Sequence, residues 1–175
     1  MKIRKTSDIH DEGLLGELEV PLQNGAIRRI DELDRFAALI NQRFPFVLNR
    51  IDWTKVPGHL LLAAEAKTSD EARDPDRYFT RRAPKLRAFI EGAAKQHRIG
   101  METEVMFMGD SVSFVLRMSL TTLSEYSPKL FSYPQHVYVI PETGEWCMSY
   151  TFEDDLFFGI APETKRSSRL SVVRK

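Results

Sequence analysis

The sequence predicts a single α+β domain, with an antiparallel sheet built mainly from residues 103–160 and with helices 31–44 and 84–98 packed on one face of it. Three observations lead to this fold class. The chain has 175 residues, which suits one domain. Two segments carry apolar residues at helical spacing, and most of the chain after residue 103 has the composition of β-strands. We expect the domain to span residues 1–162 and the basic segment 163–175 to form a flexible tail.

The first helix is predicted at residues 31–44, after a short strand at 14–21 and a turn at 23–25. Asp31 suits its N-cap, and Pro45 stops it. One helical face carries its apolar residues, which are Leu33, Phe36, Ala37, Ile40 and Phe44. Residues 51–66 are ambiguous: Pro57 could open a short buried helix at its first position, but Gly58 weakens that prediction.

The second helix is predicted at residues 84–98, opened by Pro84 and ended by Gly100. Its apolar stripe consists of Leu86, Phe89, Ile90 and Ala93. The preceding segment, residues 67–76, is polar, rich in aspartate and without apolar anchors. We expect it to form an exposed, mobile loop.

The segment after residue 100 is predicted to be mainly strand. Residues 103–108 form one strand, and 112–120 alternate in polarity, although a helical pattern competes there. Residues 121–131 are expected to form a short helix or an irregular crossing, and 156–160 a further strand.

Residues 136–151 are predicted to form a β-hairpin around the sequence Pro-Glu-Thr-Gly at 141–144. A three-residue loop with Gly144 in the left-handed conformation avoids a positive φ at the β-branched Thr143. This loop pairs Ile140 with Trp146, and it places His136 and Cys147 on opposite faces of the sheet. The thiol and the imidazole are therefore not expected to form a catalytic pair.

Composition limits the class of protein. Lys plus Arg and Asp plus Glu both number 25, so no overall basic field attracts nucleic acid. The single cysteine forms no intramolecular disulfide, the N-terminus lacks the apolar region of a signal peptide, and no apolar run is long enough to cross a membrane. We expect a cytoplasmic protein that does not associate with membranes.

Clustered acids are the candidate partner-binding residues. They lie at the two ends of the hairpin and are Glu142, Glu145, Glu153, Asp154 and Asp155. Adjacent carboxylates converge poorly on one metal ion, and the histidines lack a zinc-binding spacing, so neither a metal site nor a cofactor is predicted.

Two other functions remain open. An enzyme could assemble its site from distant residues, namely Asp110, His136, Cys147 and Glu153. A weak nucleic-acid binder could use Arg77, Arg81 and Lys85, which align at i, i+4 spacing on a helix. Acidic residues directly upstream would partly neutralise this basic patch.

The hairpin has the form H-x-Y-x-I…E-W-C-x-x-Y and is followed by E-D-D-L-x-F-G, in a small neutral α+β domain. Over residues 103–160 this pattern resembles the immunity proteins of bacterial polymorphic-toxin and contact-dependent inhibition systems. The resemblance implies a non-enzymatic protein that binds and blocks one cognate toxin. Its acidic residues would then face a basic surface of that toxin.

Overall fold

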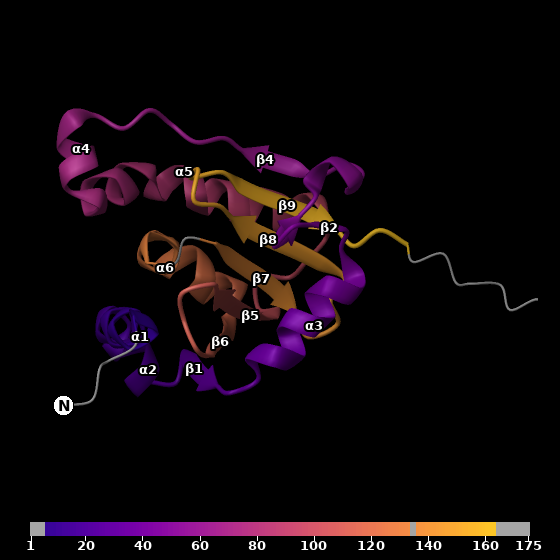
Figure 1. The fold of residues 1–175 in the computed structure, drawn as a ribbon, viewed down its shortest axis with the longest axis horizontal. Helices are drawn as coiled ribbons and strands as arrows, with labels where there is room; N and C mark the ends of the chain where they lie inside the picture. Colours follow the sequence, from indigo (N-terminus) through magenta and orange to yellow (C-terminus); the bar gives the residue numbers. More distant parts are fainter. Residues whose placement is uncertain (1–5, 134–135, 164–175) are drawn as a thin grey trace, which may run out of the picture.

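A computed structural model describes residues 6–133 and 136–163 of the chain, and it confirms the predicted α+β class (Figure 1). The predicted tail lies outside these residues from position 164 onward. The helices are α1 (Thr6–Glu17), α2 (Glu19–Gln23), α3 (Leu33–Arg43), α4 (Ser69–Arg73), α5 (Pro75–Gln96), α6 (Leu120–Ser132) and a 3₁₀ turn (Trp53–Lys55). The strands are β1 (Ile27–Ile30), β2 (Phe46–Val47), β3 (Arg50–Ile51), β4 (Leu60–Leu62), β5 (Glu104–Gly109), β6 (Val115–Ser119), β7 (Val137–Pro141), β8 (Trp146–Tyr150) and β9 (Leu156–Ile160).

Seven strands form one antiparallel sheet in the order β1-β6-β5-β7-β8-β9-β4. Residues 103–160 supply its five central strands, as predicted, and β1 and β4 pair along its two edges. The short strands β2 and β3 form a separate hairpin.

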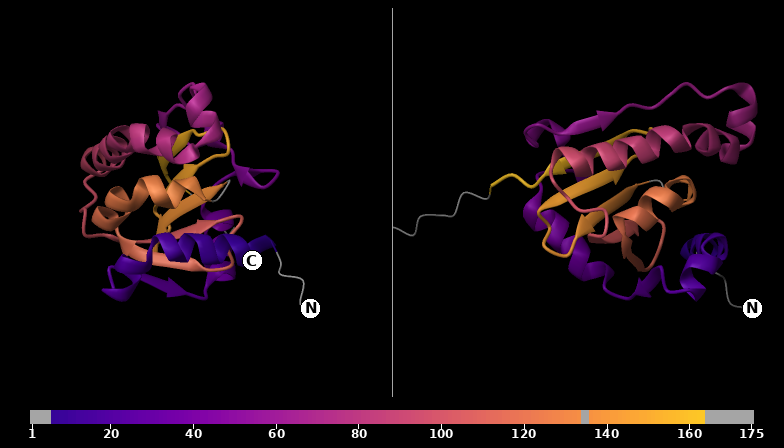
Figure 2. Two further views of the ribbon diagram at one scale, coloured as in Figure 1. Left: turned by 90° about the vertical axis from the view of Figure 1, so that its left-hand side faces the viewer. Right: turned by 180° about the vertical axis from the view of Figure 1, so that it is seen from behind.

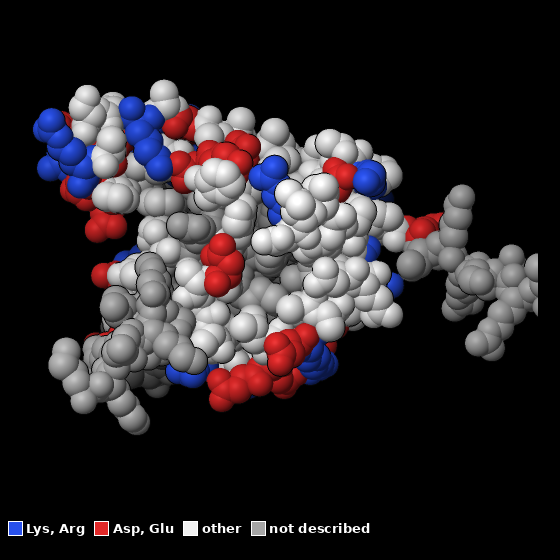
Figure 3. Space-filling model, viewed as in Figure 1, with Lys and Arg blue, Asp and Glu red and all other residues white. Residues whose placement is uncertain are grey.

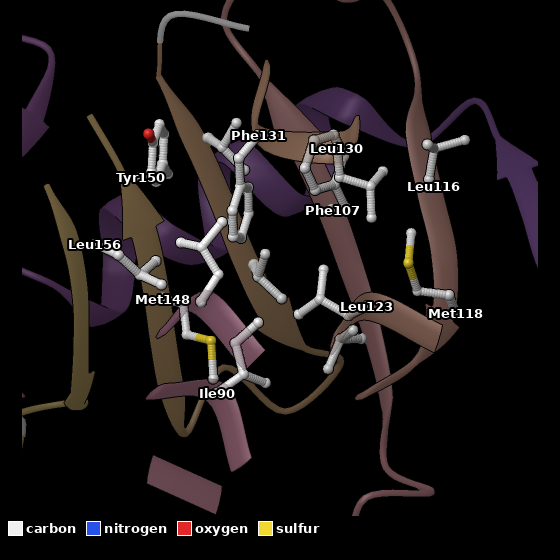
Figure 4. Close-up of a cluster of buried hydrophobic side chains, with 14 of the residues drawn as sticks. Ile90, Phe107, Leu116, Met118, Leu123, Leu130, Phe131, Met148, Tyr150 and Leu156 are labelled. Atoms are coloured by element: carbon white, nitrogen blue, oxygen red, sulfur yellow. The ribbon is translucent and has the colours of Figure 1, made fainter. Parts of the chain in front are cut away.

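Helices α5 and α6 cover one face of the sheet, and the β2–β3 hairpin projects on the other side (Figure 2). The core beneath α5 and α6 is drawn in Figure 4, where Ile90 and Phe131 point toward side chains of the sheet. The rings of Phe131 and Tyr150 stack with centroids 5.0 Å apart. Packing of this kind fixes α6 against β8.

Helix α3 covers the opposite face, so the prediction that helices 31–44 and 84–98 share one face is wrong. Phe36 and Ile40 of α3 pack in a second core with Met106, Ile140 and Cys147 of the sheet. The central strands are apolar on both faces, and each face therefore needs its own cover.

Three other local predictions are also wrong. Residues 14–21 belong to α1 and α2 instead of a strand, and Leu14 and Leu18 are fully buried there. The predicted loop 67–76 contains α4, whose N-terminus is fixed by a capping box between Thr68 and Glu71. Helix α5 begins at Pro75, so Pro84 lies inside it and removes one helical hydrogen bond.

The β7–β8 hairpin differs from the prediction by one residue. Val137 lies opposite Tyr150 and Val139 opposite Met148, so the loop contains four residues, 142–145. Gly144 has φ of +67°, as its predicted left-handed conformation requires. The extra loop residue, Glu145, accepts a hydrogen bond from the backbone of Ala161, which extends the pairing of β8 with β9.

Candidate functional site

A cavity of about 340 Å³ lies on the α3 side of the sheet, where the β2–β3 hairpin and the β8–β9 turn contribute to one lining. The hairpin and the residues after it supply Val47, Arg50, Ile51, Asp52, Trp53, Thr54 and His59. The sheet and the β8–β9 turn supply His136, Tyr138, Ser149, Thr151, Glu153, Asp155 and Phe157. We refer to this space as the hairpin cavity.

The β2–β3 hairpin is fastened to the sheet through Tyr138. The hydroxyl of Tyr138 donates to the backbone carbonyl of Asn49 at 3.3 Å, and its ring contacts Phe46. Burial raises the pKa of this hydroxyl to about 12, so it stays protonated and keeps its donor role at neutral pH. The hairpin is therefore held over the sheet although its strands contain only two residues each.

Aromatic rings form one wall of the hairpin cavity. Trp53 and Phe157 are stacked, with an interplanar angle of 5° and centroids 5.2 Å apart. The indole N–H of Trp53 donates to Ser149 Oγ at 3.0 Å, and His59 lies at a tilt against the same two rings. Since the indole is both stacked and hydrogen-bonded, this wall is rigid.

The β8–β9 turn supplies the acidic side of the cavity. Its backbone closes through a 2.9 Å hydrogen bond from Thr151 N–H to the carbonyl of Asp155, with Asp154 at φ of +67°. The carboxylate of Asp154 accepts from the Tyr150 hydroxyl at 2.8 Å and pairs with Lys67 at 2.6 Å. These contacts fix the turn, and they leave Glu153 and Asp155 to line the cavity.

Exposed apolar side chains surround the cavity. Val47, which lines it, is 45% exposed, and its neighbour Leu48 is 91% exposed. Phe152, which lies between the lining residues Thr151 and Glu153 in the chain, is 58% exposed, and its ring meets that of His136 edge-on at 5.2 Å. We call Val47, Leu48 and Phe152 the apolar rim. In Figure 3, uncharged surface covers much of the middle of this face, with isolated acidic and basic side chains beside it.

The five predicted partner-binding acids are divided between two places. Glu153 and Asp155 line the hairpin cavity, and Asp154 supports the turn beside it. Glu142 and Glu145 lie at the other end of the hairpin, where Glu142 pairs with Arg35 at 2.7 Å. The strands between these ends are five residues long, roughly 17 Å. The five acids therefore do not form one continuous patch.

A larger cavity, of about 950 Å³, contains Glu142 and Glu145 in its lining. Its lining includes Glu163, the last described residue. The hairpin cavity is formed entirely by described residues, and it is the better defined candidate site.

The four residues of the possible enzyme site are not brought together. Asp110 accepts a hydrogen bond from the backbone of His136 at 3.2 Å, and His136 and Glu153 both line the hairpin cavity. Cys147 lies in the second core with no exposed surface, and burial raises the pKa of its thiol far above the ordinary value. A thiol that stays protonated is a poor nucleophile.

The predicted reason for separating His136 from Cys147 is wrong, because the shifted register places both on the α3 side of the sheet. Continuing the observed pairing sets His136 opposite Thr151, four residues from Cys147 along the chain. That separation is about 13 Å at the rise of a β-strand. The two side chains are too far apart for a hydrogen bond.

The predicted basic patch is paired with carboxylates of the same chain. Arg81 contacts Glu71 at 2.5 Å and Glu65 at 2.6 Å, and Lys85 contacts Glu65 at 2.9 Å. Arg77 contacts Asp74 at 3.1 Å. These three cations are neutralised where they lie, which weakens their attraction for a phosphate backbone.

Sequence reasoning missed the residues that shape the site, above all Leu48, Trp53, His59 and Phe152. The sequence Phe-Val-Leu-Asn-Arg-Ile at 46–51 carries one usable signal, since Asn is common in tight turns between apolar residues. Phe152 stands directly before the acidic cluster and could have been identified as an exposed aromatic next to a turn. Trp53 and His59 have no local signal, because they meet Phe157 only through the fold.

Among the side chains that the structure describes, no group of three or more histidine, cysteine, aspartate or glutamate residues is arranged to hold a metal ion. Within residues 6–133 and 136–163, no helix is both long and apolar enough to cross a membrane. Comparison of the sequence with family models and with curated proteins finds no match.

Proposed function

We propose that this protein is a non-enzymatic, immunity-type inhibitor, which binds a cognate bacterial toxin through the apolar rim and the hairpin cavity. The observation that carries the proposal is Leu48, a large apolar side chain that is 91% exposed at the tip of a hairpin. Its backbone has φ of +55°, which is unfavourable for a residue with a side chain. Strained, exposed positions of this kind occur at functional sites.

The surroundings of Leu48 support a protein partner. An exposed apolar group around a concave, rigid centre has the arrangement of a protein interface, in which a few anchors are surrounded by contacts that exclude water. The resemblance to immunity proteins, the cytoplasmic location and the bacterial origin belong to the same proposal. A toxin is the occupant that this resemblance implies.

The test uses the protein encoded by the gene next to that of this chain, because immunity proteins and their toxins are produced as pairs. We expect the two purified proteins to bind with nanomolar affinity, and co-expression of this chain to protect cells from the toxin. Absence of a complex together with absence of protection would overturn the proposal.

The interface is tested with the double variant Leu48→Glu and Phe152→Glu, which places charge on the rim. We expect binding to weaken at least 100-fold and protection to be lost, because the rim can no longer be desolvated. The matched control is Val20→Glu on α2, which changes a 67% exposed valine outside the rim and should bind normally. Normal binding by the double variant would place the interface elsewhere.

A further inference from the structure

We propose that the hairpin cavity binds an arginine side chain of the protein partner. This inference rests on the proposed function and names the chemistry that the partner presents. The cavity volume of about 340 Å³ is at the low end of the range for ligand pockets, so it suits one inserted side chain. Arginine is enriched among the residues that dominate binding energy at interfaces.

The charge of the lining favours a cation. Three carboxylates, those of Asp52, Glu153 and Asp155, line the cavity, against one guanidinium, that of Arg50. Asp52 is already paired with Lys55 at 2.8 Å. Glu153 and Arg50 are about half exposed and 3.4 Å apart, so their attraction is weakened by solvent.

Asp155 is the carboxylate that lacks a cation. One of its oxygens, Oδ1, accepts the backbone N–H of Ala64 at 2.8 Å. Among the described residues, no lysine or arginine lies within ion-pair distance of Asp155. The carboxylate is thus held in place by the backbone and has its remaining acceptor capacity available for an incoming donor.

The aromatic wall favours arginine over lysine. A guanidinium is planar, is only weakly hydrated and stacks on aromatic faces, whereas an ammonium is compact and strongly hydrated. The partly buried rings of Phe157 and His59 line the cavity beside the carboxylates, and the buried Trp53 supports Phe157 by stacking on it. A guanidinium can stack on a ring and donate to several acceptors at once, which an ammonium cannot do as well.

The apolar rim strengthens this interaction. When a partner covers Val47, Leu48 and Phe152, water is excluded from the mouth of the cavity. The attraction between a carboxylate and a guanidinium is stronger in such a desolvated setting than in open solvent. One inserted arginine would then be the central anchor of the complex.

The first test uses the full-length protein and three short capped peptides, Gly-Arg-Gly, Gly-Lys-Gly and Gly-citrulline-Gly. The chain has two tryptophans, so two indole N–H signals can be followed by NMR. We expect the arginine peptide to shift the Trp53 signal saturably, with a dissociation constant on the order of millimolar. Trp146 lies in the core on the other face of the sheet, so its signal should not shift.

Citrulline has nearly the shape of arginine without the charge, and it should bind at least tenfold more weakly. Lysine should also bind several-fold more weakly than arginine. Equal binding of arginine and citrulline peptides, or no shift of Trp53 with any peptide, would overturn the arginine pocket.

The second test is the variant Asp155→Asn, which removes the charge and keeps an oxygen to accept the Ala64 N–H. We expect it to weaken binding of the arginine peptide and of the toxin at least tenfold. The control is Glu125→Gln, an exposed change on α6 across the sheet. Unchanged binding by Asp155→Asn would overturn the pocket.

The two proposals fail differently. If the rim variant loses the toxin while Asp155→Asn retains it, the arginine pocket is wrong and the proposed function stands. If the arginine peptide binds at Trp53 in an Asp155-dependent manner but the neighbouring gene product gives neither a complex nor protection, the pocket stands and the proposed function is wrong.

Discussion

The guanidinium of Arg82 donates a 3.0 Å hydrogen bond to the hydroxyl of Tyr78, and both side chains are fully buried. Arg82 also donates to the carbonyls of Ala63 at 2.8 Å and Leu62 at 3.2 Å, and to the carbonyl of Asp154. It thereby ties the end of β4 and the β8–β9 turn to α5. Since that turn carries the acidic side of the hairpin cavity, Arg82 supports the site from the other face of the sheet.

Replacing Arg82 with methionine is predicted to destabilise the protein by about 3 kcal/mol or more, because several buried carbonyls lose their donor. Urea unfolding measures the loss. Hydrogen exchange at residues 60–65 should also become faster, since β4 loses its anchor. The control Arg87→Met lies on the exposed side of the same helix and should change stability by about 0.5 kcal/mol or less. Equal losses in the two variants would contradict the anchoring role of Arg82.

Glu71 should make stability depend on pH. Two interactions lower the pKa of this carboxyl from 4.5 to about 2. The hydrogen bond from Arg81 has the larger effect, and the hydrogen bond from the backbone N–H of Thr68 has the next largest. A lowered pKa in the folded state gives stabilisation that is complete above pH 4.5 and is lost as the pH falls toward 2. We expect Glu71→Gln to be less stable than the wild type at pH 6, and the two to converge near pH 2.

Urea midpoints measured between pH 2 and 7 test this prediction. Glu125→Gln serves as the control, because no ion pair joins its side chain to another described residue. Its midpoints should follow the wild type throughout. A constant difference between Glu71→Gln and the wild type at every pH would mean that the lost contribution is not the ionised carboxylate.

The parts of the fold that were predicted correctly depend on short-range signals. The helix at 31–44 is confirmed as α3 within two residues at each end, because its apolar spacing and Pro45 act locally. The left-handed Gly144 and the strand 156–160 were likewise correctly predicted. Each follows from a few neighbouring residues.

The parts that were missed depend on distant contacts. The β7–β8 register is set partly by the backbone hydrogen bond from Ala161 to Glu145. Ala161 directly follows β9, and Glu145 directly precedes β8. Helix α5 continues through Pro84 because Tyr78, Phe79 and Arg82 are buried before it. In α1, Gly13 allows the ring of Tyr133 to approach within 2.8 Å of the position that a Cβ would occupy. Neither local propensity nor periodicity contains these contacts.

The candidate site was found only in part for the same reason. Glu153 and Asp155 were selected from the sequence as exposed acids, and they line the cavity. The aromatic wall and the β2–β3 hairpin were not predicted, because three separated segments must fold together to form them. The sequence therefore indicated acidic residues without the concave surface in which two of them lie.

Cys147 is predicted to be chemically inert in the folded protein. Its thiol is fully buried, and its raised pKa keeps it protonated. We expect reaction with 5,5′-dithiobis(2-nitrobenzoate) at pH 8 to be at least about 100-fold slower in buffer than in 8 M urea, since it requires opening of the core. Under the proposed function, Cys147→Ala should bind the toxin as the wild type does. Fast modification of the native thiol would favour the enzyme alternative.

Two glycine-to-alanine substitutions are predicted to change stability in opposite directions. Gly144 has φ of +67°, and an added Cβ would lie 3.1 Å from the side chain of Leu39 on α3. Gly144→Ala should therefore destabilise the protein by about 1–2 kcal/mol, through left-handed strain and crowding of α3.

Gly92 lies inside α5, with nothing within 4 Å of an added Cβ. Gly92→Ala should stabilise by about 0.5–1 kcal/mol, because alanine loses less backbone entropy in a helix. Urea unfolding of both variants measures the two changes, and a shift in the same direction would contradict the left-handed turn at Gly144.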